Sequence, residues 1–149
     1  MNAIPDNLKN FLNQNKVNTV CFVDNKNYPY CINCFYVFDE SNNCLIFKSS
    51  HGTYHHELIL DSAFVSGTIL PETLDTLKLR GIQFTGKLIS STEVETLHLN
   101  SKYLKKYPFS IAILGSVWAV KLEFLKFTDN TLGFGNKTIW KLNTEGDTN

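Results

Sequence analysis

The chain has 149 residues, enough for one domain with a substantial core but short for two. Its 14 basic and 14 acidic residues balance to zero net charge, which excludes the concentrated basic surface that duplex nucleic acid or an anionic membrane requires. The N-terminal segment 1–16 is too polar for a signal peptide, and no apolar run approaches the roughly 18 residues that span a bilayer. We therefore expect a single cytoplasmic domain, 1–149, that binds neither nucleic acid nor membrane.

The first half of the chain predicts a helix followed by a meander of strands. Segment 1–16 has Pro5 in the first turn of an amphipathic helix, which we expect to cover one end of the fold. Asn- and Asp-rich turns then separate strand-like runs at residues 17–23, 30–38 and 44–48. Three further elements follow, a polar turn at 49–52, a short helix at 53–60 and a strand at 63–70.

The second half adds two long strands and a helix between them. Residues 77–89 predict a strand interrupted by Gly81 and Gly86, where a bulge or bend is expected. Thr92 and Glu95 have the capping-box spacing and predict a helix that ends near Pro108. Three segments complete the chain, a strand at 116–127 that is apolar on both faces, a last strand-like segment at 137–142, and a frayed polar tail at 143–149.

These elements predict a mainly β fold with helices, of the α+β class. Six or so strands, turns about every ten residues and glycines in a long strand favour a small closed or nearly closed antiparallel barrel. An open α+β sheet is the alternative.

All four cysteines fall in the first third of the chain. Cys31 and Cys34 have the CxxC spacing, but residues three apart on a strand point to opposite faces, which argues against a zinc or redox motif. We expect free, mostly buried thiols in a reducing compartment.

Arg80 is the only arginine among the 14 basic residues. Lysine dominates in a chain that is also rich in Asn, Ile and Phe, as a drift towards AT-rich codons would produce. A lone arginine is then expected where a compact ammonium cannot replace a planar, forked guanidinium. Arg80 is therefore a candidate ligand of an anion or of a ring edge; the alternative is a surface residue at a sheet edge.

Hydroxyl and imidazole side chains gather at one junction between a strand and a helix. Ser49, Ser50 and Thr53 lie where backbone N–H groups and the positive end of a helix dipole could hold a phosphate. The alternative is that Thr53 only caps its helix. His51 and His55 have a spacing found among metal ligands, but no third ligand stands at a fixed offset, and no metal site is predicted.

The order of these motifs resembles a known family. The strand ending at Ser49 and Ser50, Thr53-x-His55, Val65-x-Gly67-Thr68 and Arg80-Gly81-x-Gln83-Phe84-x-Gly86 are similar to the pyridoxamine-phosphate-oxidase-like FMN-binding split barrels. Within that superfamily, Trp118 and the run 126–137 resemble the small bacterial YhbP-like group. The resemblance covers nearly the whole chain.

This resemblance implies a six-stranded split barrel that forms a homodimer, with FMN at the subunit interface. The backbone from Cys31 to Phe35 would border the isoalloxazine ring, and Arg80 and Gln83 would lie near the flavin. Strict alternation along a strand would place Arg80 and Gln83 on opposite faces, so a bulge at Gly81 would be needed to turn both towards the flavin. Lys137 or Trp140 would reach across from the other subunit. The implied cofactor-binding residues are Ile32, Asn33, Cys34, Lys48, Ser49, Ser50, Thr53, His55, Arg80, Gln83 and Lys137.

The function expected from the resemblance is that of an FMN-dependent oxidoreductase acting on a small molecule that the sequence does not name. The flavin would perform the electron transfer, which agrees with the lack of a catalytic dyad in the sequence. The alternative is a dimer that holds a flavin or haem without turnover, since His51, His55 and His56 are available as haem ligands. A third possibility is a structural homodimer whose cleft binds no cofactor.

Overall fold

The computed structural model describes residues 2–143. Four α-helices, seven strands and two short 3-10 helices make up this part of the chain. In chain order they are α1 Asp6–Gln14, β1 Val17–Val23, β2 Pro29–Asp39, β3 Cys44–Ser50, α2 Tyr54–Asp61, β4 Phe64–Ile69, β5 Arg80–Leu88, α3 Ser91–Thr96, α4 Leu99–Lys106, η1 Pro108–Ala112, β6 Gly115–Asp129, η2 Asn130–Leu132 and β7 Lys137–Lys141. The expected frayed tail lies outside the described residues beyond Asn143.

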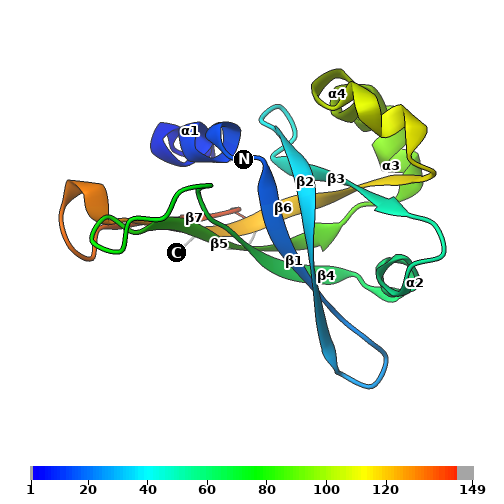
Figure 1. Cartoon of the computed structure of the whole chain (residues 1–149), viewed down its shortest axis with the longest axis horizontal. Coiled ribbons are helices and arrows are strands. Elements are labelled where there is room, and N and C mark those ends of the chain that lie inside the picture. The colour runs from blue at the N-terminus through cyan, green and yellow to red at the C-terminus, as the bar shows by residue number, and fades with distance from the viewer. Residues whose placement is uncertain (1, 144–149) are drawn as a thin grey trace.

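Six strands close into an antiparallel barrel, as the sequence predicted. The order is β3-β2-β1-β4-β5-β6, and β3 also pairs with β6 to complete the ring. β6 is long enough to serve three neighbours, since one of its edges pairs with β5 while the other pairs first with β3 and then with β7. β7 therefore extends the sheet outside the ring (Figure 1).

Aromatic and aliphatic side chains fill the barrel. Ile82 and Phe84 of β5 are buried, whereas the residues that follow each of them, Gln83 and Thr85, are exposed, as a barrel wall requires. α1 covers this core with Leu8, Phe11 and Leu12, and the expected N-terminal cover is confirmed.

A second, smaller core lies on the outside of the barrel under α3 and α4. Cys44, Ile46 and Ala119 on the outer faces of β3 and β6 pack against Leu99 and Tyr103 of α4. Ala119 of β6 faces this second core, and the next residue, Val120, faces the barrel core. The prediction that the strand at 116–127 is buried on both sides is therefore confirmed.

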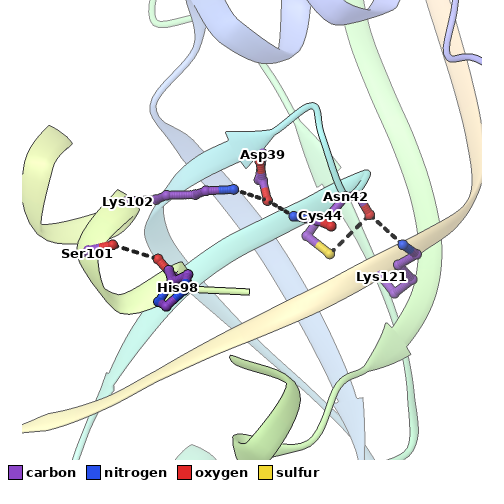
Figure 2. A network of polar contacts seen from close by, with 7 residues as sticks. All are labelled: Asp39, Asn42, Cys44, His98, Ser101, Lys102 and Lys121. Carbon is purple, nitrogen blue, oxygen red and sulfur yellow. Dashed lines mark hydrogen bonds and ion pairs between the residues drawn. The ribbon is translucent and has the colours of Figure 1, made fainter. Parts of the chain in front are cut away.

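A polar network fastens α4 to the β2–β3 turn (Figure 2). Lys102 Nζ lies 2.8 Å from the buried carboxylate of Asp39, which also accepts a 2.6 Å hydrogen bond from Asn42 Nδ2. Lys121 on β6 donates to the Asn42 carbonyl, as does the Cys44 thiol. The network fixes the helix pair, and with it the segment after α4, relative to the barrel.

Several sequence predictions are corrected by the structure. The capping box is formed by Ser90 and Glu93 instead of Thr92 and Glu95, and His98 adopts a left-handed backbone conformation (φ 54°) that divides the expected single helix into α3 and α4. The expected turn at 49–52 begins later, because Ser49 and Ser50 still pair with β6.

The glycines of β5 behave differently from each other. At Gly86 the register shifts by one residue, as expected, and an added Cβ would lie 2.2 Å from the Lys121 carbonyl oxygen. At Gly81 the ladder with β6 is regular, so the expected bulge there is wrong, and Arg80 and Gln83 point to opposite faces.

The prediction of four free thiols is also wrong. Cys21 and Cys31 face each other across β1 and β2 and form a disulfide, while Cys34 and Cys44 are free. The expected opposite orientation of Cys31 and Cys34 is confirmed, because Cys34 packs against the barrel core and Cys31 is exposed.

Candidate functional site

The barrel has an opening between β2 and β3. These strands pair only from Tyr36 and Phe47 towards their shared turn. Beyond that point the first part of β2 pairs with β1 alone, and the end of β3 pairs with β6 alone. The strands diverge there, and a cleft of about 300 Å³ lies in the opening.

Backbone groups line the β2 side of this cleft. Two hydrogen bonds fix which residues of β2 bond to β1: the Tyr36 N–H donates to the Lys16 carbonyl at 2.8 Å, and the Asp24 N–H donates to the Tyr28 carbonyl at 3.0 Å. Every second residue of β2 between Tyr28 and Tyr36, namely Tyr30, Ile32 and Cys34, therefore bonds to β1. The remaining residues, Cys31, Asn33 and Phe35, therefore direct their N–H and C=O groups to the opening. A planar ligand with donors and acceptors along one edge could pair with this strand edge.

Residues from several elements complete the cleft. Its lining is made of Ile32, Asn33, Cys34 and Phe35 of β2, Lys48 and Ser50 of β3, His55 of α2, Tyr103 of α4, and Phe109, Ser110 and Ile113 of the segment after α4. Six of the eleven predicted site residues, Ile32, Asn33, Cys34, Lys48, Ser50 and His55, thus line one cavity.

Lys48 is the one cation among the lining residues. Its ammonium donates a 2.7 Å hydrogen bond to the carbonyl of Ser110, in the segment that covers the cleft. The hydroxyl of Ser110 is buried and has no hydrogen-bond partner. An anion in the cleft could accept hydrogen bonds from both groups.

The α2 end of the cleft supplies neutral donors. Thr53, the N-cap residue, makes no side-chain cap, because its hydroxyl instead donates to the Ser50 carbonyl at 2.8 Å and lies 3.1 Å from His55 Nε2. The first N–H groups of α2 are therefore not capped by a side chain. Burial, and secondarily the neighbouring His56, lowers the pKa of His55, which is then a neutral hydrogen-bonding group near neutral pH.

The other predicted site residues lie elsewhere in the subunit. Ser49 is buried and its hydroxyl has no partner, Gln83 lines a separate cavity of about 190 Å³ on the outside of β4 and β5, and Lys137 is exposed on β7. Trp140 is buried in the barrel core, so its expected reach into a partner's cleft is wrong.

Arg80 also lies outside the cleft of its own subunit. Its guanidinium carbon is 5.2 Å from the centre of the Phe11 ring and 5.7 Å from that of Phe127, and its Nε is 3.4 Å from the Asp129 carboxylate. Burial is the largest influence on the Asp129 pKa and acts to raise it, but hydrogen bonds from Thr131 and the charge of Arg80 together lower it.

The residues that sequence reasoning missed come mainly from the segment after α4. Phe109, Ser110 and Ile113 belong to an apolar run without helical or strand periodicity, between a lysine-rich helix and β6. The lack of periodicity in so apolar a run was the available signal. Phe109 is 57% exposed, and Ile111 and Leu114 in the same segment are 77% and 84% exposed.

Comparison with known proteins gives close relatives in bacteria. A UPF0306 protein of Serratia proteamaculans is 35% identical over 133 residues, which cover 89% of this chain and 92% of that protein. The UPF0306 protein YhbP of Salmonella paratyphi A is 34% identical over 111 residues, covering 74% of this chain and 76% of that protein. No protein-family model matches the chain.

Solved structures share the fold at low sequence identity. A haem-binding protein from Mycobacterium smegmatis has a TM-score of 0.74 at 13% identity; the match covers 94% of this chain and 60% of that one. A Clostridium acetobutylicum protein of the pyridoxine phosphate oxidase family, related to general stress protein 26, has a TM-score of 0.61 at 11% identity and covers 91% and 92% of the two chains. An FAD-binding protein from Mesorhizobium loti has a TM-score of 0.60 at 13% identity, covering 85% and 95%. These likenesses establish the split-barrel fold.

Proposed function

The chain belongs to the UPF0306 family, and from this premise and the cleft in its barrel we propose that it binds FMN and acts as a flavin-dependent oxidoreductase. The observation that carries the proposal is the cleft itself, which joins a free strand edge to a cation and a helix start. Split-barrel proteins that bind FAD or haem support a planar ligand. A small-molecule substrate would meet the cofactor there.

The residues of the cleft fit the two ends of FMN. Lys48, Ser50 and the first N–H groups of α2 would hold the phosphate, with His55 as a neutral hydrogen-bonding group. The edge of β2 at Asn33 and Phe35 would bond to the polar edge of the ring system. Bound flavin supplies the electron transfer, and these side chains orient it and limit access of water.

A second subunit would complete the site. Phe109, Ile111 and Leu114 expose apolar side chains next to the cleft, and Phe35 on β2 meets Phe109 edge to face with ring centres 6.3 Å apart. Such a patch at a ligand cleft favours a homodimer with the cofactor at the interface. Analytical ultracentrifugation of wild type and Leu114→Ser tests this, since the serine variant is expected to shift towards monomer.

Titration with FMN tests the main proposal. Wild type is expected to quench flavin fluorescence with micromolar affinity or better. Lys48→Met is expected to weaken binding about tenfold or more, because a charge-assisted hydrogen bond to phosphate is lost. Lys141→Met, an exposed lysine on β7, is the matched control and should bind as wild type. Absence of binding at high micromolar FMN would refute the proposal.

Enzymatic turnover is tested separately from binding. Under anaerobic conditions, a nicotinamide donor is expected to bleach the absorbance of the flavin held by the protein. Binding without bleaching by any nicotinamide donor would favour a flavin carrier without turnover.

Haem is the second candidate ligand, favoured by a histidine pair near the α2 end of the barrel. The rings of His51 and His56 lie 5.1 Å apart, and His56 Nδ1 is buried without a hydrogen-bond partner. Addition of haem would then give a Soret band that His51→Ala reduces and that FMN does not displace. No Soret shift on mixing would exclude this ligand.

A further inference from the structure

β1 and β2 project from the barrel as a hairpin (Figure 1). A cross-strand cysteine pair, Cys21 and Cys31, lies at the base of this hairpin, because Cys21 is the last residue of β1 that pairs with β4. Cys21 and Cys31 are directly opposed in the register, with their Cα atoms 4.1 Å apart and their sulfurs bonded. Their site is one of the pairs that are not hydrogen-bonded, where opposed side chains approach most closely. Here the two sulfurs can meet without movement of either strand.

The four cysteines differ sharply in accessibility. Cys31 is exposed and Cys21 is half-buried on the outside of the barrel. Burial raises the pKa of Cys34 to about 12 and that of Cys44 to about 11. Because the thiolate is the reactive form, the part-buried Cys34 and the buried Cys44 react slowly at neutral pH, and Cys31 is the most exposed of the four cysteines to a thiol from solution.

The disulfide does not hold these strands together by itself. Seven register pairs join β1 to β2, from Val17 opposite Phe35 to Val23 opposite Pro29, and they continue on both sides of the cysteines. Asp24 also closes the turn by accepting backbone hydrogen bonds from Lys26 and Tyr28. We therefore expect the backbone hydrogen bonds between β1 and β2 to persist when the sulfur–sulfur bond is reduced. The disulfide can then open and close without unfolding the hairpin.

We propose that Cys21 and Cys31 form a reversible dithiol–disulfide site that exchanges with low-molecular-mass thiols of the glutathione type. This site is independent of the cofactor proposed above. The thiolate of an incoming thiol attacks the exposed Cys31 sulfur, and Cys21 leaves as a thiolate and takes up a proton. A second thiolate then attacks the small-molecule sulfur of the mixed disulfide, which releases Cys31 as a thiolate that is protonated in turn. Two small thiols become one small disulfide, and the protein gains two electrons and two protons.

Equilibration in glutathione buffers tests the site. The full-length protein is incubated at stepped ratios of reduced to oxidised glutathione, quenched with acid, alkylated after denaturation, and analysed by mass spectrometry. We expect the number of alkylated cysteines to rise from two to four along the series while the circular dichroism of the folded protein is unchanged. A pair that stays bonded until the protein unfolds, or that stays reduced at every ratio, would overturn the proposal.

Variants in which one cysteine is replaced by serine test which of the two sulfurs reacts with the small thiol. Cys21→Ser leaves the exposed Cys31, whose thiolate is expected to attack oxidised glutathione, form a mixed disulfide with one glutathione and release the other as the reduced thiol. Cys31→Ser leaves the half-buried Cys21, which should react several-fold more slowly, and Cys44→Ser, in the second core and outside the cleft, should keep the wild-type exchange. Equal rates for Cys21→Ser and Cys31→Ser would contradict entry at Cys31.

Discussion

Replacement of Arg80 separates a structural role from a role in ligand binding. Its guanidinium lies over the rings of Phe11 and Phe127 and beside the Asp129 carboxylate, so it joins α1 to β5 and β6. Each ring contact at a partly exposed site contributes about 0.5–1 kcal/mol. Lysine keeps the charge but loses the planar stacking, and Arg80→Lys is therefore expected to lower the free energy of unfolding by about 1 kcal/mol.

The removal of the charge should cost more. Arg80→Met also loses the ion pair, whose guanidinium side chain is 34% exposed and whose carboxylate side chain is 13% exposed, and an expected total loss of about 1–2 kcal/mol follows. For a chain of this size a loss of 1 kcal/mol lowers the melting temperature by about 2–4 °C.

Urea denaturation and FMN titration of the same preparations check this reasoning. Stability should fall in the order wild type, Arg80→Lys, Arg80→Met, with Lys78→Met as a surface control that changes it by less than about 0.5 kcal/mol. Flavin affinity should be equal in all four proteins. If Arg80→Lys weakened FMN binding while stability was unchanged, the proposed packing role of Arg80 would be refuted and Arg80 would be identified as a ligand contact.

Three further predictions concern the packing and charges of the barrel. Lys102→Met should lower stability by about 2 kcal/mol in urea denaturation, because the buried Asp39 carboxylate keeps only one side-chain donor; an unchanged midpoint would contradict this. Gly86→Ala should lower stability by about 3 kcal/mol, since its Cβ would overlap the Lys121 carbonyl oxygen, and a neutral result would mean that the strands separate freely. Because the pKa of Asp129 is lowered in the folded protein, its carboxylate stabilises the fold at any pH above the ordinary pKa of an aspartate. This stabilisation is lost as the pH falls through the lower pKa of the folded state. Asp129→Asn should therefore show a smaller loss of stability than wild type between about pH 5 and pH 2, and parallel curves would refute this.

The sequence predicted the strands because alternation and turn residues are local signals. Ser90 and Thr92 both stand three residues before a glutamate, and the spacing alone does not distinguish them. The choice depends on tertiary packing, because a helix that starts after Ser90 directs Val94 into the second core. The break between α3 and α4 also depends on tertiary packing, because no sequence pattern marks His98 as a residue with a left-handed backbone conformation.

The cleft was predicted only in part. Residues of β2, β3 and α2 were found because they are close in sequence and chemically distinctive. Phe109, Ser110 and Ile113 were missed because they reach the cleft through the packing of α4, which depends on contacts such as that between Lys102 and Asp39. The cysteine pairing required the register of β1 and β2, which the turn residues 24–28 determine and composition does not.

The closure of the barrel by β6 has a consequence for synthesis on the ribosome. β3 is complete at Ser50, but its partner on that edge begins only at Gly115, and among the strand pairings of the described residues this one joins the residues furthest apart in sequence. While the intervening residues are being translated, the nascent chain presents the edge of β3 without its final neighbour. Such long-range pairing slows folding and exposes an apolar strand to mispairing. We therefore expect folding to be completed only after β6 leaves the exit tunnel, and a nascent chain that stops before Gly115 should depend on a chaperone that shields strand edges.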